Sequence, residues 1–261
     1  MTTPILLTGG TGTLGRQMLP LLRAAGRKVR VLSRRPGEDA DGVEYLTGDL
    51  ATGEGIDAAV TGVETVVHCA GSAKGDDIKA RHLVRAASAA GVQHLVYISV
   101  VGADRVPVTS RADRAMFGYY AAKRAGEVAV AGSGIPWTTL RATQFHDLLL
   151  LTARQMAKLP VLPVPSGIRV QPVDSGEVAA RMVELALGAP AGLVADLGGP
   201  RVYGMDELIR SYLRAVGKRR PLLPMRMPGG AAAAMRAGAN LTTSGTTGRR
   251  TWEEFLAGVD G

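Results

Sequence analysis

The stretch Thr8-Gly9-Gly10-Thr11-Gly12-Thr13-Leu14-Gly15 decides the fold of this chain. It follows a short apolar run at residues 5–8 and leads into an apolar pattern with helical spacing at residues 14–25. Glycines at a strand-to-helix turn let the backbone approach a pyrophosphate, whose charge then meets the helix N-terminus. The stretch therefore predicts a Rossmann-type βαβ unit that binds a dinucleotide, the alternative being a glycine turn with a purely structural role.

The first 142 residues alternate short β-branched runs with longer helical patterns, which is typical of a parallel sheet covered by helices. We expect strands at residues 5–8, 29–33, 43–46, 65–69, 94–99 and 137–141, and helices at residues 14–25, 56–60, 78–90 and 119–131. A glycine follows each helix before the next strand, at Gly26, Gly62, Gly91, and Gly132 or Gly134. This order predicts an α/β fold with a doubly wound parallel sheet.

Beyond Arg141 the pattern is less regular. Helices are expected at residues 148–158, 176–187, 206–216, 231–239 and 252–256, with a proline-rich stretch at residues 220–228. We expect residues 1–145 to form an NADP-binding Rossmann domain. Residues 146–261 would form a smaller C-terminal substrate-binding lobe packed on it, the two making a single structural unit.

Composition limits the classes of protein to consider. The net charge is +8, yet the basic residues are spread along the chain and only 4% of residues are aromatic, so neither a nucleic acid nor a membrane is expected as a partner. No apolar run suggests a membrane span or a signal sequence, so we expect a cytoplasmic protein, either a monomer or a homodimer. The single cysteine, Cys69, excludes a cysteine-cluster metal site and is interpreted as a buried filler in preference to a reactive thiol.

The end of the second expected strand bears on the choice of cofactor. An acidic residue there would hold a ribose 2′-hydroxyl, whereas arginine accommodates a 2′-phosphate. This chain has Ser33-Arg34-Arg35, with no carboxylate before Glu38. Because the guanidinium fork suits phosphate geometry, we expect NADP in preference to NAD, the alternative being two solvated surface arginines.

Three motifs together resemble a known family: Thr8 to Gly15, Gly48-Asp49-Leu50 and His68-Cys69-Ala70-Gly71. The chain resembles the NmrA-like NAD(P)-binding proteins among the atypical short-chain dehydrogenase/reductases. The resemblance implies that Asp49 and Leu50 flank the adenine and that Ala70 and Gly71 line the cofactor; without it, Asp49 is a polar residue in a turn. The residues expected to contact the cofactor are Thr8, Gly9, Gly10, Thr11, Gly12, Thr13, Leu14, Gly15, Ser33, Arg34, Arg35, Asp49, Leu50, Cys69, Ala70, Gly71, Ser99 and Lys123.

A Tyr-x-x-x-Lys pair, Tyr119 and Lys123, stands where a short-chain reductase carries its acid/base. Residues four apart share a helix face, so the ammonium would lie near both the phenol and the nicotinamide ribose. A nearby cation lowers the pKa of a phenol, which makes Tyr119 the expected acid/base, with Lys123 orienting the ribose. The alternative is a chance pairing, and the adjacent Tyr120 is expected to be a packing residue.

The third catalytic element departs from the family's enzymes. A hydroxyl normally follows the fifth strand, but the aligned position is Val101, and Ser99 stands two residues earlier. We expect Ser99 to take part in catalysis or to contact the cofactor instead, with weaker polarisation of the substrate carbonyl. The expected substrate-lining residues are Val101, Gln144, Phe145 and His146, with polar packing as the alternative for His146.

Two classes of function fit this sequence. The leading hypothesis is an NADP-dependent oxidoreductase that transfers a hydride to or from a small carbonyl, quinone or enone compound. The rival is a non-catalytic NADP(H)-sensing regulator, and an epimerase or dehydratase that uses bound cofactor would share the same residues. The tyrosine–lysine pair favours the enzyme, and Val101 favours the sensor.

Overall fold

The structure is a computed structural model that describes residues 3–39, 42–71, 75–242 and 245–259. The chain divides into two compact units. The first unit comprises Met1–Ser99, Ala122–Leu140 and Gly176–Val194, and the second comprises Val100–Ala121, Arg141–Ser175 and Ala195–Gly261. The chain passes between the units several times, so their bounds differ from the single boundary expected at residues 145/146. The assignment of a substrate-binding part stays a prediction.

A twisted sheet forms the centre of the first unit. Its strands are β1 (Ile5–Thr8), β2 (Val29–Ser33), β3 (Val43–Thr47), β4 (Thr65–His68), β5 (His94–Val100), β6 (Trp137–Ala142) and the short β9 (Gly192–Leu193). Their order is β6-β5-β4-β1-β2-β3, β9 pairs with β6, and β1 pairs in parallel with both β2 and β4. The six longer strands agree with the expected ones to within one residue at each end, because runs of β-branched residues buried on both faces specify parallel strands. The predicted Rossmann-type fold is therefore observed.

The strand register brings three chain segments to one edge of this sheet. Thr8, the last residue of β1, lies opposite Leu32 of β2 and His68 of β4. His68 in turn lies opposite Tyr97 of β5. The chain reverses its direction of strand addition at β1, and ligands of doubly wound sheets bind at that reversal, outside the carboxyl ends of the strands.

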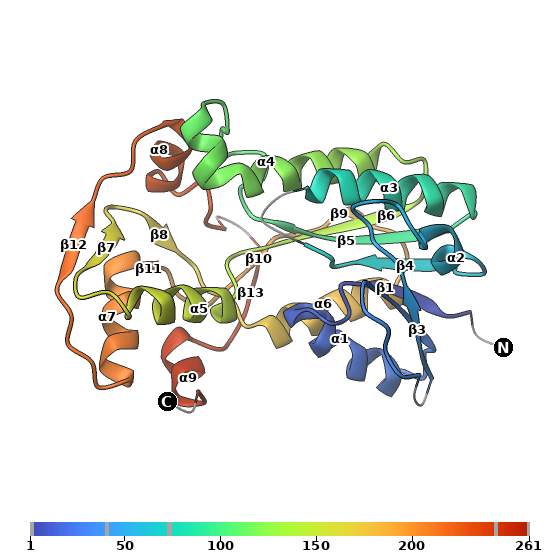
Figure 1. Cartoon of the computed structure of the whole chain (residues 1–261), viewed down its shortest axis with the longest axis horizontal. Helices are drawn as coiled ribbons and strands as arrows, with labels where there is room; N and C mark the ends of the chain where they lie inside the picture. Colours follow the sequence, from blue (N-terminus) through green and yellow to red (C-terminus); the bar gives the residue numbers. More distant parts are fainter. Residues whose placement is uncertain (1–2, 40–41, 72–74, 243–244, 260–261) are drawn as a thin grey trace. The chain divides into compact units, whose positions relative to one another are not determined.

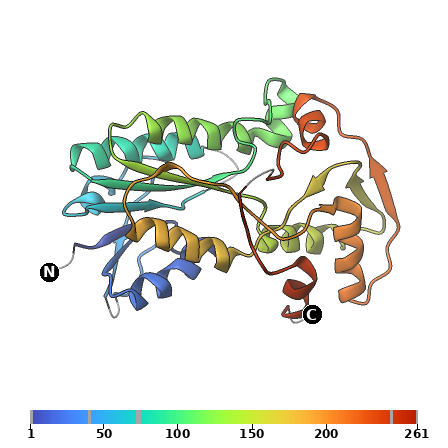
Figure 2. The ribbon, with the colours of Figure 1, turned by 180° about the vertical axis from the view of Figure 1, so that it is seen from behind.

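Helices cover both faces of the sheet. Figures 1 and 2 show α1 (Thr13–Ala24) and α6 (Ser175–Leu187) along one face, and α3 (Asp76–Ala89) and α4 (Arg111–Ala131) along the other. The short α2 (Ile56–Val60) packs against α3. Pro20 lies within the observed helix α1. Gly26, Gly62, Gly91 and Gly134 all have positive φ, so the helix-ending glycines are observed and Gly134 is the fourth of them.

The second unit is built mainly of helices, with short strand pairs. The helices are α5 (His146–Met156), α7 (Met205–Ala215), α8 (Gly230–Arg236) and α9 (Trp252–Ala257). Two separate pairs are β7 (Leu162–Pro165) with β12 (Leu222–Met225) and β8 (Arg169–Val170) with β11 (Tyr203–Gly204). The strand β10 (Leu197–Gly198) pairs with β13 (Thr246–Thr247) and, through Leu197, with Ala142 at the end of β6. The core of this unit gathers around Trp252, which is fully buried and donates from Nε1 to Ser211 Oγ at 2.8 Å.

Helix α4 begins eight residues before the expected residue 119. Ser110 and Asp113 explain the earlier start, because Asp113 N–H donates to Ser110 Oγ at 2.9 Å while Ser110 N–H donates to the Asp113 carboxylate at 3.2 Å. This reciprocal pair caps the helix. Within the described part of the chain, none of the helices is long and apolar enough to cross a bilayer.

Candidate cofactor-binding site

The glycine loop between β1 and α1 leaves no room for side chains on its inner side. A Cβ atom on Gly9, whose φ is +73°, would lie 2.7 Å from the backbone N of Ala70. A Cβ on Gly15 would lie 2.2 Å from the carbonyl oxygen of Gly9. The loop is closed by the Gly12 N–H, which donates to the same Gly9 oxygen at 2.9 Å. Only glycines permit this close approach of loop, helix and β4.

The N-terminus of α1 is suited to an anion. The helix begins at Thr13 with Gly12 as its N-cap, which provides no side chain to the first-turn amides, and no acidic residue lies in that turn. Thr11 and Thr13 on the outer side are exposed. A phosphate placed there meets backbone N–H groups and the positive end of the helix dipole. These residues fit the pyrophosphate of a dinucleotide.

The arginines after β2 are exposed at the same edge of the sheet. Arg34 and Arg35 follow Ser33, and the Arg35 N–H donates to Ser33 Oγ at 3.2 Å. Among the residues that the structure describes, neither guanidinium forms an ion pair with a carboxylate. Both side chains are exposed, in a position that an anionic ligand can approach.

The Gly48-Asp49-Leu50 segment is held by local contacts. Gly48 N–H donates to the Ser33 carbonyl at 2.9 Å, which fixes the segment beside the end of β2. One carboxylate oxygen of Asp49 accepts from the Ala51 N–H at 2.8 Å, and Leu50 is buried in the core. Asp49 thus stabilises its own turn, as the alternative interpretation expected, and its contact with an adenine stays a prediction.

Strand β4 ends in a buried histidine, His68. His68 stacks on the ring of Tyr97 with 5.4 Å between centroids, and its Nδ1 lies 2.7 Å from Thr8 Oγ1. Burial, and then the charges of Lys123 and Lys79, lower the pKa of His68 to about 3, so the ring stays neutral and serves structure.

Cys69 follows His68 and packs against α1. The residue is half-buried, its Sγ donates to Met18 Sδ at 3.6 Å, and desolvation of the thiol raises its pKa to about 12. A thiol that stays protonated is a weak nucleophile, which agrees with the interpretation of Cys69 as a filler.

Lys123 on α4 reaches the carboxyl ends of β4 and β5. Its Nζ donates to the Ile98 carbonyl at 3.1 Å, and it lies 3.5 Å from the position of a Cβ on Gly71. Helix α4 approaches β5 this closely because Gly126 faces the Tyr97 hydroxyl, which would lie 2.3 Å from a Cβ there. The structure therefore brings together two residues predicted from separate motifs, Lys123 and Gly71.

Ser99 lies next to Ile98 at the end of β5. Its side chain is 4% exposed, and its Oγ has no hydrogen-bond partner among the described residues. Buried hydroxyls are rarely left without a partner. A ligand group that reached this hydroxyl would satisfy it, so the site fits a cofactor that extends from the glycine loop past Gly71.

Asp76 is a residue of this region that the sequence did not single out. It opens α3, is 1% exposed, and its Oδ2 lies 3.2 Å from Lys123 Nζ. An acidic residue in the first turn of a helix is common, so no local signal distinguished it.

The residues predicted to act on substrate belong to the second unit. Tyr119 lies on α4 and is 37% exposed. Tyr120 is buried in the core and burial raises its pKa to about 12, in agreement with a packing role. Tyr119 and Lys123 lie on the same helix, but the boundary between the two compact units falls between them.

The other expected substrate residues are mostly enclosed. Val101 is fully buried, with its N–H donating to the Ala142 carbonyl. Gln144 is half-buried and its Oε1 accepts from the Gln171 N–H at 3.4 Å. Phe145 is half-buried as the N-cap of α5.

His146 is fully buried in the same unit. Its ring lies 4.9 Å from that of Phe255 and 5.9 Å from that of Trp252, measured between centroids. Burial lowers its pKa to about 4. This placement is that of the packing alternative.

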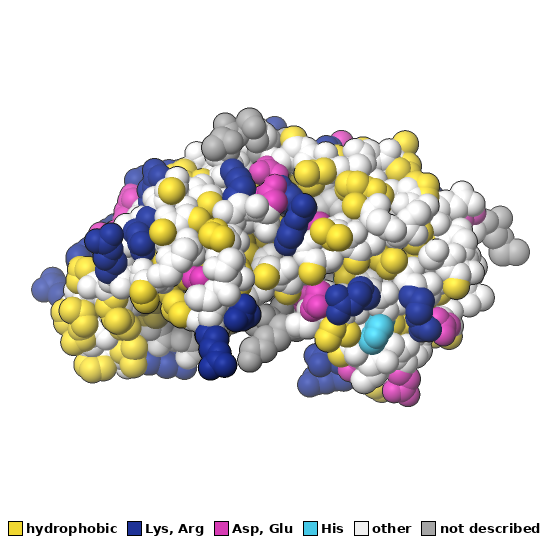
Figure 3. All heavy atoms as spheres, turned by 90° about the horizontal axis from the view of Figure 1, so that it is seen from above, with side chains coloured by type: hydrophobic (Ala, Val, Ile, Leu, Met, Phe, Trp, Pro, Cys, Tyr) yellow, Lys and Arg dark blue, Asp and Glu magenta, His cyan; other side chains and the backbone are white. Residues whose placement is uncertain are grey.

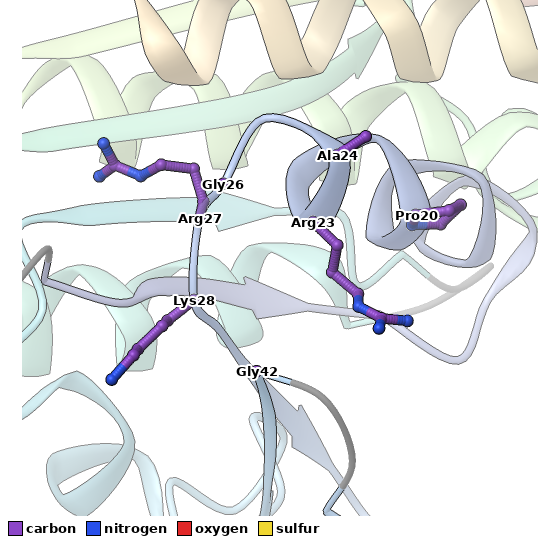
Figure 4. A pocket seen from close by; sticks show the side chains of 7 residues that line it. All are labelled: Pro20, Arg23, Ala24, Gly26, Arg27, Lys28 and Gly42. Atoms are coloured by element: carbon purple, nitrogen blue, oxygen red, sulfur yellow. The ribbon is translucent and has the colours of Figure 1, made fainter.

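A pocket lies at the C-terminal end of α1, away from the glycine loop. This pocket of about 480 Å³ is lined by Pro20, Arg23, Ala24, Gly26, Arg27, Lys28 and Gly42. Figure 4 shows the side chains of Arg23, Arg27 and Lys28 pointing away from one another, so their charges do not converge on one ligand. On the face seen in Figure 3, basic side chains are likewise interspersed with apolar and acidic ones. No group of three potential metal ligands occurs among the described residues.

Comparison with known proteins gives consistent matches. Residues 9–187 match the model of a family described as NAD(P)H-binding. A ceramide reductase of Caulobacter vibrioides is 32% identical over 246 residues, which cover 86% of this chain and 74% of the relative. A (4-alkanoyl-5-oxo-2,5-dihydrofuran-3-yl)methyl phosphate reductase of Streptomyces griseus is 31% identical, covering 82% of this chain and 74% of the relative.

Solved structures show the same fold. The NADPH-dependent quinone oxidoreductase of Escherichia coli, solved with NADPH, has a TM-score of 0.81 at 20% identity, covering 97% of this chain and 98% of the other. The predicted α/β fold is confirmed. The range matched by the family model contains every residue expected to contact the cofactor except Thr8.

Proposed function

We propose that this chain, which belongs to the NAD(P)H-binding family, is an NADP(H)-dependent oxidoreductase acting on a small carbonyl, quinone or enone compound. One observation carries the proposal: Lys123, Gly71 and the unsatisfied Ser99 hydroxyl lie at neighbouring strand ends beside the glycine loop. The reductases among its relatives, which include the ceramide reductase, support this class of reaction. An NmrA-like subtype is part of the same proposal.

In this proposal each group has a distinct task. The bound cofactor, when reduced, supplies a hydride. The α1 N-terminus holds the pyrophosphate, Arg34 and Arg35 hold the 2′-phosphate, and Lys123 holds the ribose on the nicotinamide side. Tyr119 donates the proton to the substrate oxygen in the reductive direction and accepts it in the reverse direction.

The test of catalysis is NADPH consumption over a panel of quinones, aldehydes and ketones. Tyr119→Phe is expected to lower kcat at least about 100-fold, because a positioned acid contributes about 10² to 10⁴ in rate. Tyr120→Phe is the matched control, since it removes a neighbouring hydroxyl that burial keeps protonated, and it should retain turnover. Normal turnover by Tyr119→Phe would refute the assignment.

A non-catalytic sensor is the second candidate, and Val101 favours it. The position that carries a hydroxyl in the family's enzymes holds an apolar side chain that is fully buried here. Tight NADPH binding without turnover of any compound in the panel would support this candidate.

The choice of cofactor has its own experiment. Arg34→Ala and Arg35→Ala are expected to weaken NADPH binding about tenfold or more and to leave NADH binding almost unchanged, because only NADPH carries the 2′-phosphate. Arg81→Ala, an exposed arginine on α3, is the control. An unchanged preference for NADPH in both variants would contradict the predicted phosphate contact.

A further inference from the structure

An ion pair is almost completely buried beside the proposed cofactor site. Asp76 Oδ2 lies 3.2 Å from Lys123 Nζ, and the two side chains are 1% and 3% exposed. The pair faces Gly71, because a Cβ on that glycine would lie 3.4 Å from Asp76 Oδ2 and 3.5 Å from Lys123 Nζ. The ring of Tyr97 lies under the ammonium, 5.0 Å from Nζ to the ring centroid.

Burial of this pair is costly, and stability alone does not account for it. Removing two charges from water carries a large desolvation cost, and apolar residues of similar volume often stabilise a fold as well or better. The other acidic residue of α3 shows the less costly arrangement: Asp77 pairs with Arg81 at 2.9 Å, and both side chains remain partly exposed, at 31% and 57%. A buried charge at Lys123 is therefore best explained by a use for that charge.

Asp76 makes a charged Lys123 possible at this position. Burying an ammonium is costly without an opposite charge, and the Asp76 carboxylate offsets that cost. The carboxylate stands at the start of α3, where the helix dipole favours a negative charge. Its Oδ1 also lies 3.7 Å from Lys79 Nζ, a side chain that is 17% exposed at the rim.

We propose that Asp76 is a positioning residue whose carboxylate holds the Lys123 ammonium beside Gly71, in place to contact the nicotinamide-side ribose of the cofactor. The inference rests on the proposed function, because it takes Lys123 to be a cofactor contact. Asp76 itself acts through Lys123.

Two effects of Asp76 on an anionic cofactor have opposite signs. If the carboxylate acted only through its charge, its removal would strengthen the binding of any nucleotide phosphate, because repulsion would fall. If it positions Lys123, its removal weakens only those ligands that reach the lysine. The sign and the ligand dependence together distinguish the two effects.

The experiment measures the affinity of the full chain for two ligands by titration calorimetry. NADPH contains the nicotinamide ribose, and adenosine 2′,5′-bisphosphate lacks it. Asp76→Asn is expected to weaken NADPH binding about tenfold or more, which is typical of losing a hydrogen bond from a charged group. The affinity for the bisphosphate should stay within about twofold of the wild-type value. Asp77→Asn removes the same charge one residue away and should change neither affinity.

Lys123→Met and the double variant with Asp76→Asn complete the set. The double variant is expected to bind NADPH as weakly as Lys123→Met alone, because the carboxylate has no further role once the ammonium is gone. It also contains no unpaired buried charge, so it remains informative if Asp76→Asn alone fails to fold. Lys79→Met removes the more exposed lysine near Asp76, and it is expected to bind both ligands with wild-type affinity.

Several results would overturn the inference. They are equal NADPH affinities in Asp76→Asn and Asp77→Asn, equal weakening of both ligands by Asp76→Asn, or a double variant clearly weaker than Lys123→Met. Any of these with NADPH binding by the wild type leaves the proposed function standing. A wild-type chain that does not bind NADPH would overturn the proposed function itself, and the inference with it.

Discussion

Replacing Gly15 by alanine is expected to disrupt the glycine loop, although the same change usually strengthens a helix. Gly15 lies in the first turn of α1 and has no positive φ, so alanine suits its backbone and would gain about 1 kcal/mol of helix propensity. The new Cβ, however, would lie 2.2 Å from the Gly9 oxygen and 2.5 Å from the Gly10 Cα. Ordinary contacts begin near 3.4 Å, and the atoms in the way belong to the backbone.

The loop must therefore move by about 1 Å, and overpacking of this kind costs about 1–3 kcal/mol. After the gain of about 1 kcal/mol in helix propensity is subtracted, we expect Gly15→Ala to lower the free energy of unfolding by up to about 2 kcal/mol and to weaken NADPH binding at least tenfold. Gly118→Ala is the matched control, since it is also a helical glycine but its Cβ would meet nothing within 4 Å. That variant should gain about 0.5–1 kcal/mol.

Urea unfolding followed by far-UV circular dichroism gives the two free energies, and calorimetric titration gives the affinities. The two variants should change the free energy of unfolding in opposite directions, and this difference is the main test. If Gly15→Ala were as stable as Gly118→Ala and bound NADPH like the wild type, the loop would not be the tightly packed cradle described here.

Two further predictions follow from buried titratable groups. In the unfolded chain His68 and His146 take up a proton near pH 6.5, whereas in the native chain the pKa is about 3 for His68 and about 4 for His146. Because the unfolded state binds more protons, the free energy of unfolding should fall as the pH drops from 7 to 4.5. For His146 the full pKa shift corresponds to ~3 kcal/mol of unfolding free energy. His146→Phe should therefore flatten the pH dependence of stability measured by urea unfolding. Parallel pH curves for the variant and the wild type would contradict this. Cys69, whose pKa is raised to about 12, should react with a disulfide reagent at pH 8 much more slowly in the native than in the urea-unfolded chain; equal rates would show that the thiol is not enclosed.

The elements predicted well from the sequence are those whose signals are local. Parallel strands buried on both faces are runs of β-branched residues, so β1, β2 and β4 were found almost to the residue. The early start of α4 was not predicted, although the sequence contains a signal for it: Ser110 and Asp113, three residues apart, form a capping pair.

Short pairings in the second unit had no local signal. Strands such as β8 and β11 contain two residues each, and tertiary contact alone aligns them. The same limit applies to side-chain exposure. His146 is polar and follows a strand end, which suggested a ligand site, yet its ring is enclosed by Phe255 and Trp252.

For the candidate site, the sequence pointed to the glycines of the loop, and it did not point to Asp76, whose contact with Lys123 is tertiary. The glycines of the loop are recognisable because their role depends on the absence of a side chain, at fixed spacing. Asp76 and Lys123 are 47 positions apart in the sequence and meet only because α3 and α4 lie on the same face of the sheet.

Binding and chemistry therefore rest on different kinds of residue in this chain. The proposed cofactor contacts lie on glycine backbone and on a buried ion pair, both held by the packing of the first unit. The proposed proton transfer depends on one partly exposed phenol, Tyr119, in the second unit. Changes at Gly15 or Asp76 should accordingly alter affinity, and a change at Tyr119 should alter turnover at unchanged affinity. A chain that lost Tyr119 would keep its cofactor site, and this is why binding measurements and turnover measurements together separate an enzyme from a sensor.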